Sequence, residues 1–258
     1  MAHPADGQQN LVELWFVDLK DSASALDALE RQTPRLAAED HKKISGSASE
    51  AAAAERRAAY IALRIVIERS WGSAWRGVPY VLEGSGKPAL PGLTGSFSLS
   101  HVDRYALIGL ARSGSIGVDL EPDRQPTVAD ARRIRIESAS IVLAHGANLP
   151  QPRQTRFLQA WVRLEAIAKA DGAGIGRLLT RLGLIGPDPI DGPLFNKCEA
   201  DTIAQRFAVC DVAVSGGCVA AVALDQPLTP LGARILPRIL PISASAIEAL
   251  MTNAPATR

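Results

Sequence analysis

The segment from Glu50 to Trp71 constrains the fold most strongly, because its apolar residues recur at helical spacing. Tyr60, Leu63 and Ile67 fall on one face of a helix, and Gly72 follows as a stop signal. A helix with one apolar face needs a layer to pack against. The chain has 258 residues, which is enough to build one large core or two small ones.

Strand and helix patterns alternate along the rest of the chain. Apolar and alternating runs predict strands at 11–19, 96–101, 105–111, 116–121, 206–214 and 218–224. Helical spacing predicts helices at 23–44, with a break at Pro34, and at 128–145 and 155–171. Short turns predict that strands 105–111 and 116–121 form one hairpin. They predict that strands 206–214 and 218–224 form another. This order predicts an α+β fold of two halves with similar make-up, residues 1–115 and 116–225.

The charge balance argues against two classes of partner. A net charge of +1 gives no strong positive field, so binding to nucleic acid or to an anionic membrane surface is not expected. The three cysteines, Cys198, Cys210 and Cys218, lack paired spacing, which predicts buried thiols in a reducing compartment. The N-terminus has no signal-like pattern, and no apolar run is long enough to span a bilayer. A cytoplasmic location is therefore expected.

The composition changes after residue 225. Residues 226–258 contain a doubled RILP sequence, whose prolines cannot occupy a central strand or the interior of a helix. We expect this extension to be an extended appendage on the protein surface, with a short helix at 246–251.

Glu165 and Lys169 stand one helical turn apart in WVRLEAIAKADGAG (161–174). On a helical wheel both fall within an apolar arc, while Gln159 and Arg163 lie on the opposite, polar side. An ordinary ion pair on a solvated face is one interpretation. Burying charges is unfavourable unless they are paired, bind a metal or serve a function, so an inward, functional pair is the other.

Two carboxylates share one strand face in GVDLE (117–121). Side chains alternate along a strand, so Asp119 and Glu121 point the same way. Adjacent carboxylates repel unless a cation lies between them, and their oxygens suit Mg²⁺ or Mn²⁺. A polar strand end before Pro122 is the plainer interpretation. A third carboxylate from a helix would favour a metal site, and Glu165 is the candidate.

The sequence FSLSH (97–101) offers hydroxyl and imidazole groups. Ser98 and Ser100 share a strand face, and His101 ends the predicted strand. A Ser–His hydrolase would be expected to show the GxSxG pattern, which is missing. Phosphate binding is an equally reasonable interpretation, and a structural histidine at a strand end is a third.

The turn GSGKP (84–88) resembles a P-loop only in part. Val81 stands where the first glycine is required, and Pro88 stands where Ser or Thr should follow the lysine. We therefore reject a Walker A motif. A Gly-Lys-Pro turn can still hold Lys87 toward an anion.

In combination, these motifs resemble one family. Their order is G-K-P, F-S-L-S-H, G-V-D-L-E and W-x-x-x-E-A-x-x-K-A-x-G-x-G, within roughly residues 40–225. This order is similar to that of the 4′-phosphopantetheinyl transferase superfamily, specifically the surfactin-synthetase-activator type. The resemblance implies a monomer of two similar α/β subdomains related by a pseudo-twofold axis, with the active site in the cleft between them.

The resemblance also implies an activity. Such enzymes transfer the 4′-phosphopantetheine arm of coenzyme A to a serine of an apo acyl or peptidyl carrier protein and release adenosine 3′,5′-bisphosphate. By similarity, Asp119, Glu121 and Glu165 would bind Mg²⁺, with Mn²⁺ as an alternative ion. Glu165 would also be the general base, and Lys169 would stabilise the leaving phosphate. The resemblance implies that coenzyme A contacts Ser100 and His101 at its pyrophosphate, Lys87 and Pro88 at its adenosine end, and Lys43, Arg56 and Arg57 at its 3′-phosphate. Asp119 and Lys169 are implied contacts as well.

One residue departs from the family pattern, and two other functions stay open. Many relatives carry lysine immediately before the catalytic glutamate, where this chain has Leu164. A non-catalytic relative that binds coenzyme A or a carrier protein is one alternative. A metal-dependent phosphoesterase that uses the same three carboxylates is another. Fatty-acid, polyketide and nonribosomal-peptide carriers are all candidate partners.

Overall fold

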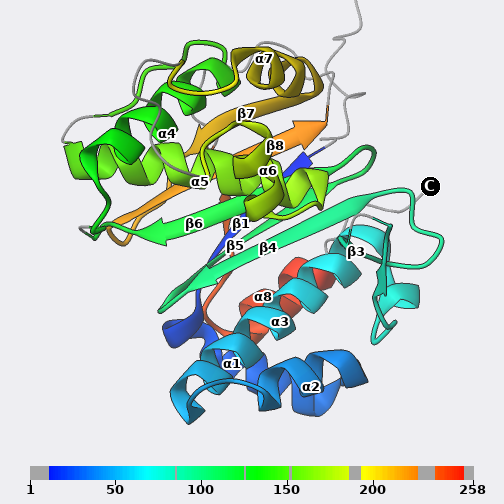
Figure 1. Ribbon diagram of the computed structural model, residues 1–258. Coiled ribbons are helices and arrows are strands. Elements are labelled where there is room, and N and C mark those ends of the chain that lie inside the picture. Colours follow the sequence, from blue (N-terminus) through cyan, green and yellow to red (C-terminus); the bar gives the residue numbers. More distant parts are fainter. Residues whose placement is uncertain are drawn as a thin grey trace, which may run out of the picture.

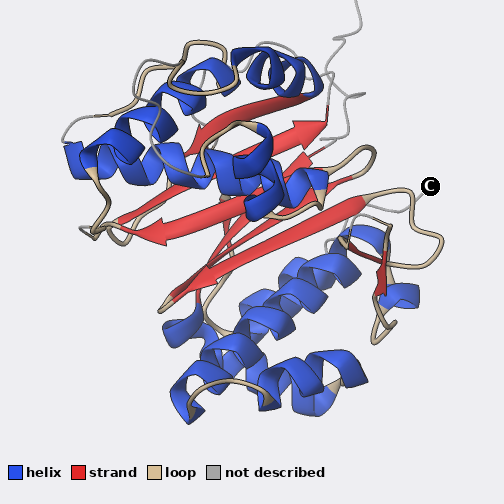
Figure 2. Cartoon of the chain, viewed as in Figure 1, coloured by secondary structure: helices blue, strands red, loops and turns tan. Residues whose placement is uncertain are grey.

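The computed structural model describes residues 12–84, 86–124, 126–150, 153–185, 193–225 and 236–252. Two larger sheets lie in the middle of the molecule, and helices cover both outer sides (Figure 1, Figure 2). The prediction of a mixed α+β fold is therefore confirmed. None of the described helices is both long and apolar enough to cross a membrane.

The helices follow the predicted segments closely, except for two short ones that the sequence pattern does not predict, α6 and α7. They are α1 (Leu19–Gln32), α2 (Ala38–Ser45), α3 (Glu50–Trp71), α4 (Asp130–Leu143), α5 (Arg153–Asp171), α6 (Ile175–Arg181), α7 (Lys197–Arg206) and α8 (Ala244–Thr252), with a 3-10 turn at Ser73–Trp75. The strands are β1 (Val12–Asp18), β2 (Val81–Leu82), β3 (Pro88–Ala89), β4 (Ser96–Val102), β5 (Tyr105–Ala111), β6 (Ile116–Pro122), β7 (Phe207–Val212), β8 (Cys218–Asp225) and β9 (Arg238–Ile239).

The first sheet has the order β4-β5-β1-β9, and the second has the order β6-β8-β7. Strands β2 and β3 form a small separate ribbon. The predicted hairpin of 105–111 with 116–121 is wrong, because β5 pairs with β1 and β4 whereas β6 pairs with β8. Gly109 of β5 lies directly against the side chains of Ile116 and Val118, so β6 crosses the face of β5 instead of lying beside it. The predicted β7–β8 hairpin is confirmed.

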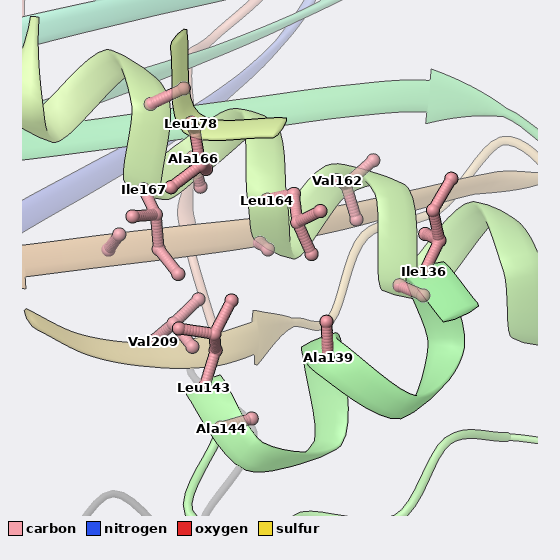
Figure 3. Close-up of a cluster of buried hydrophobic side chains, with 14 of the residues drawn as sticks. Ile136, Ala139, Leu143, Ala144, Val162, Leu164, Ala166, Ile167, Leu178 and Val209 are labelled. Carbon is pink, nitrogen blue, oxygen red and sulfur yellow. The ribbon is translucent and has the colours of Figure 1, made fainter. Parts of the chain in front are cut away.

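Alternation along each strand divides the core into layers. In β1, Trp15 and Val17 face α1 and α3, whereas Leu14 and Phe16 face the second sheet. A third cluster joins the second sheet to α4, α5 and α6 (Figure 3), and it includes residues of α7 as well. The even-numbered residues of β6, 116 to 120, pack between the two sheets. Asp119 therefore points to the other face of β6, toward α5.

A row of serines joins the two sheets at one edge. The hydroxyl oxygens of three alternate residues of β4 accept hydrogen bonds from backbone N–H groups of β6, at 3.0 to 3.3 Å. The pairs are Ser96 with Ile116, Ser98 with Val118, and Ser100 with Leu120. Side-chain oxygens thus take the place of a backbone ladder between β4 and β6. This serine row fixes the register of β6, and with it the position of Asp119.

The C-terminal extension contributes to the core, which corrects the expectation of a surface appendage. Strand β9 pairs in parallel with β1, and Leu240 and Ile247 are each 1% exposed. Helix α8 includes the predicted helix at 246–251 and packs on α1 and α3 (Figure 1). Pro237 and Pro241 are accommodated because they lie outside β9, which is only two residues long and lies at the sheet edge. Residues 226–235 lie outside the described part of the chain.

Candidate active site

Helix α5 presents one partly exposed stripe to the rest of the molecule. From residue 157 to residue 170, every residue is buried except Trp161, Glu165 and Lys169. These three are spaced four residues apart, so they lie along one side of the helix. Both charges therefore lie on a side of α5 that a ligand can reach.

The opposite side of α5 differs from the prediction. Gln159 and Arg163 are each 1% exposed, although the helical wheel places them on a polar side. Both donate hydrogen bonds to Asp211 of β7, at 2.9 and 2.7 Å. A buried arginine is tolerated there because the facing strand supplies a carboxylate.

Gly117 lets α5 pack directly on β6. A β-carbon at this position would overlap the carbonyl oxygen of Ala166 and the amide nitrogen of Ala170. Asp119 and Glu121 lie on the same face of β6 as Gly117. The close approach therefore brings the exposed stripe of α5 next to both carboxylates, as the strand alternation predicts.

Asp119 accepts hydrogen bonds from two sides of the site. Its Oδ1 lies 2.9 Å from Ser100 Oγ on β4 and 2.6 Å from Lys169 Nζ on α5. Its Oδ2 is buried and has no hydrogen-bond partner among the residues that the structure describes. Lys169 thus points across to β6.

Negative charge is crowded at this point. Burial and the neighbouring Asp119 raise the pKa of Glu165 to about 6. The same two causes raise the pKa of Glu121, which also accepts a hydrogen bond from Arg124 at 3.1 Å. A divalent cation would relieve this repulsion and would give the unpartnered Asp119 Oδ2 a ligand role. The residues present therefore fit such an ion.

The fit is that of a partial site. Within the described ranges, no three His, Cys, Asp or Glu side chains lie close enough to hold a metal on their own. Mg²⁺ usually keeps several waters and is bound through one or two carboxylates together with substrate phosphates. The arrangement suits that mode, and the ligand set of Asp119, Glu121 and Glu165 stays a prediction.

A cavity of about 360 Å³ lies beside the stripe of α5. Its lining includes Glu165 and Lys169 from α5, together with His101 at the end of β4. Burial, assisted by Arg56 and Lys169, lowers the pKa of His101, so this imidazole is neutral at pH 7. The cavity thus offers an acid, an ammonium group and a neutral imidazole within one enclosure.

The Gly-Lys-Pro turn also reaches this cavity. Lys87 and Pro88 both line it. The Lys87 ammonium donates hydrogen bonds to Ser115 Oγ at 2.7 Å and to the carbonyl oxygen of Ile116 at 2.6 Å. Burial lowers the pKa of Lys87 to about 8. Lys87 therefore ties the turn to β6 while adding positive charge to the cavity wall.

Of the other residues expected to contact coenzyme A, some line the first cavity and others do not. Lys43 lines the cavity, and Arg56 donates a hydrogen bond to the Lys43 carbonyl oxygen at 3.0 Å. Arg57 does not line it and instead pairs with Asp27 of α1 at 2.8 Å. Ser100 does not line it either, although both of its neighbours on β4 do. The structure thus brings Lys43 to the cavity and directs Arg57 elsewhere.

A second cavity of about 800 Å³ adjoins the other side of Glu165. Its wall is largely apolar and includes Phe157 and Trp161 of α5 and Ile136 of α4. Glu121 lines it as well. Glu165 therefore lies between two cavities.

Leu164 is a core residue. Its side chain is 0% exposed and lies in the cluster between α5, α4 and β7, with Leu143 and Val209 among its members (Figure 3). A lysine at this position would bury a charge in an apolar layer. The departure from the family pattern is consistent with the packing of this chain.

Sequence reasoning missed the aromatic wall of the first cavity. Tyr60, Tyr80 and Phe97 all line it. Tyr60 shares a helix face with Leu63, so its periodicity indicates core packing. Periodicity does not separate the wall of a cavity from the interior of a core, and no motif marks Tyr60 or Tyr80. Phe97 belongs to FSLSH, but only the hydroxyl and imidazole groups of that motif indicate a site.

Comparison with known proteins adds no family assignment. No protein-family model matches the chain, and no curated protein matches it.

Proposed function

We propose that the protein is a 4′-phosphopantetheinyl transferase, which transfers the phosphopantetheine arm of coenzyme A to a serine of an apo carrier protein. The observation that carries the proposal is the place of Glu165, between two cavities and beside Asp119 and Lys169. Transfer to a serine needs a general base that the serine hydroxyl can reach while coenzyme A is bound. We assign coenzyme A to the first cavity and the carrier serine to the second.

The first cavity suits a phosphate-bearing ligand. Lys43, Lys87 and Lys169 supply positive charge, which a pyrophosphate needs more than it needs covalent catalysis. Tyr60 and Tyr80 supply aromatic surface for an apolar or planar part of the ligand. The neutral His101 has one N–H group to donate.

The chain's own residues would divide the chemistry as follows. Asp119, Glu121 and Glu165 would hold Mg²⁺ together with phosphate oxygens of coenzyme A, and the ion would supply positive charge to the pyrophosphate when bound. Glu165 would take the proton from the carrier serine, because a hydroxyl is a poor nucleophile without a general base. Lys169 would hydrogen-bond the leaving phosphate oxygen or give it a proton.

The proposal extends to the architecture. Residues 1–115 and 116–225 would be two similar halves related by a pseudo-twofold axis, in a monomeric, cytoplasmic enzyme. The two larger sheets support the proposal of two similar halves, since helices cover each of them on its outer face only (Figure 1). Residues 226–258 would be an addition to the first half.

Release of adenosine 3′,5′-bisphosphate tests the function against its alternatives. The protein is incubated with coenzyme A and Mg²⁺, with and without an apo carrier protein. The transferase releases the bisphosphate only when the carrier is present. A phosphoesterase would release a product from coenzyme A without it, and a non-catalytic binding protein would release none in either mixture.

A further inference from the structure

We infer that Ser100 is a positioning residue for Asp119, and not a contact of the coenzyme A pyrophosphate as the family resemblance implies. This inference rests on the proposed function. It concerns the hydrogen bond between the two side chains, with Ser100 Oγ 2.9 Å from Asp119 Oδ1.

The hydroxyl of Ser100 has no proton left for a phosphate. A serine hydroxyl carries one proton and two lone pairs. Its proton is donated to Asp119 Oδ1, and one lone pair accepts the N–H of Leu120 at 3.3 Å. An ionised pyrophosphate oxygen only accepts hydrogen bonds. Ser100 therefore cannot donate to the pyrophosphate while it holds Asp119.

The direction of the side chain agrees with this chemistry. Ser100 is 7% exposed and faces β6 within the serine row. Leu99 and His101, its neighbours on β4, both line the first cavity, and Ser100 does not. Strand alternation thus turns Ser100 away from the cavity and toward Asp119.

Holding Oδ1 decides where Oδ2 lies. Asp119 Oδ1 accepts one hydrogen bond from Ser100 of β4 and one from Lys169 of α5, so the carboxylate is held from both sides. Oδ2 is left buried and without a partner in the described ranges. Groups that hydrogen-bond a metal ligand typically contribute about 10- to 100-fold to metal affinity. Ser100 forms such a hydrogen bond to Asp119, the proposed metal ligand. Lys169 forms one as well, but it is also proposed to act on the leaving phosphate.

The test measures metal and coenzyme A affinity separately. Mn²⁺ binding is followed by electron paramagnetic resonance, and coenzyme A binding is followed by calorimetry in EDTA. We expect Ser100→Ala to weaken Mn²⁺ binding about tenfold and to leave metal-free coenzyme A affinity unchanged. Ser100→Thr keeps the hydroxyl and should keep Mn²⁺ affinity.

Ser96→Ala is the matched control. Ser96 accepts a hydrogen bond from the N–H of Ile116 in the same row and makes no contact with Asp119. Ser96→Ala therefore measures the effect of losing a hydrogen bond of the serine row without losing the bond to Asp119. If Ser100→Ala does not fold, Ser100→Cys keeps the shape with a weak donor and should weaken Mn²⁺ binding in the same direction.

Two results would overturn the inference. One is a loss of metal-free coenzyme A affinity in Ser100→Ala with Mn²⁺ affinity intact, which would make Ser100 a pyrophosphate contact. The other is an unchanged Mn²⁺ affinity together with unchanged coenzyme A affinity. A wild-type protein that binds no coenzyme A even with Mg²⁺ present would refute the proposed function, and Mn²⁺ binding by the same variants would still decide the role of Ser100.

Discussion

Lys169 of α5 and Asp119 of β6 are fifty residues apart in sequence, and their Nζ and Oδ1 atoms are 2.6 Å apart in the structure. The Asp119 side chain is 7% exposed, whereas that of Lys169 is 33% exposed and lines the first cavity. The pair therefore connects the buried floor of the site to the space where a ligand would bind. Glu165, one turn before Lys169, is the third charged side chain at this point of the site.

Replacing Glu165 by Gln should stop transfer without unfolding the protein. The amide keeps the size of the side chain but cannot act as a base, and losing a general base costs about 10²–10⁴-fold in rate. Transfer is measured as the mass gain of a carrier protein, and folding as thermal unfolding. A variant with the wild-type rate would show that Glu165 is not the base.

The same substitution should change how stability depends on pH. Burial and Asp119 raise the pKa of Glu165 from 4.5 to about 6 in the folded state. A carboxyl with a raised pKa favours the folded state while protonated, and that contribution is lost as pH rises from about 4.5 to about 6. In urea unfolding, Glu165→Gln should therefore gain stability relative to wild type between pH 4 and pH 7. A constant difference would contradict the raised pKa.

The titration of Glu165 should also respond to a divalent cation. A cation beside the carboxylate favours its ionised form, so Mg²⁺ should move the titration midpoint below about 6. Carbon-13 NMR of the Glu165 carboxyl measures the midpoint with and without Mg²⁺, and the control is Mg²⁺-free buffer with KCl at equal ionic strength. The same midpoint in both samples would argue against a metal site at Glu165.

Gly117→Ala should damage both stability and activity. The added methyl group would overlap the backbone of α5 at Ala166 and Ala170, so the helix must move away from β6. We expect a loss of about 3 kcal/mol in the free energy of unfolding, at the upper end for overpacked sites, and loss of transfer. Gly176→Ala is the control, because a β-carbon there meets nothing within 4 Å. That change should be neutral or stabilise α6 by up to about 1 kcal/mol.

The C-terminal helix should matter for stability. Ile247 is 1% exposed in the cluster with α1 and α3, and Ile247→Ala should cost about 2–5 kcal/mol. Ile242 is 59% exposed, so Ile242→Ala should change stability by less than about 0.5 kcal/mol. Chemical unfolding of the two variants compares them directly. Equal effects would mean that α8 does not belong to the core.

Local patterns predicted the parts of the site that depend on periodicity. The strand period placed Asp119 and Glu121 on one face, and the helix period placed Glu165 and Lys169 on one side of α5. The charge of Asp119 acts on the neighbouring Glu121, and Glu165 and Lys169 line the same cavity, so both placements are confirmed. These relationships follow from residues close together in sequence, so a single segment contains the information.

Relationships between distant segments were not predictable in the same way. The predicted hairpin of 105–111 with 116–121 does not form, because β6 packs across Gly109 and its backbone N–H groups donate hydrogen bonds to serine hydroxyls of β4. Arg163 looks solvent-exposed on a helical wheel because its partner, Asp211, lies on a strand 48 residues away. Each error concerns a tertiary contact that overrides a local pattern.

The most direct measurement is the mass of an apo carrier protein after incubation with this protein, coenzyme A and Mg²⁺. The account predicts that the carrier gains the mass of one phosphopantetheine group, and that the gain disappears when Glu165→Gln replaces the wild type or when EDTA is added. Acyl and peptidyl carriers from fatty-acid, polyketide and nonribosomal-peptide systems are tested in parallel. An unchanged mass for every carrier would contradict the central claim.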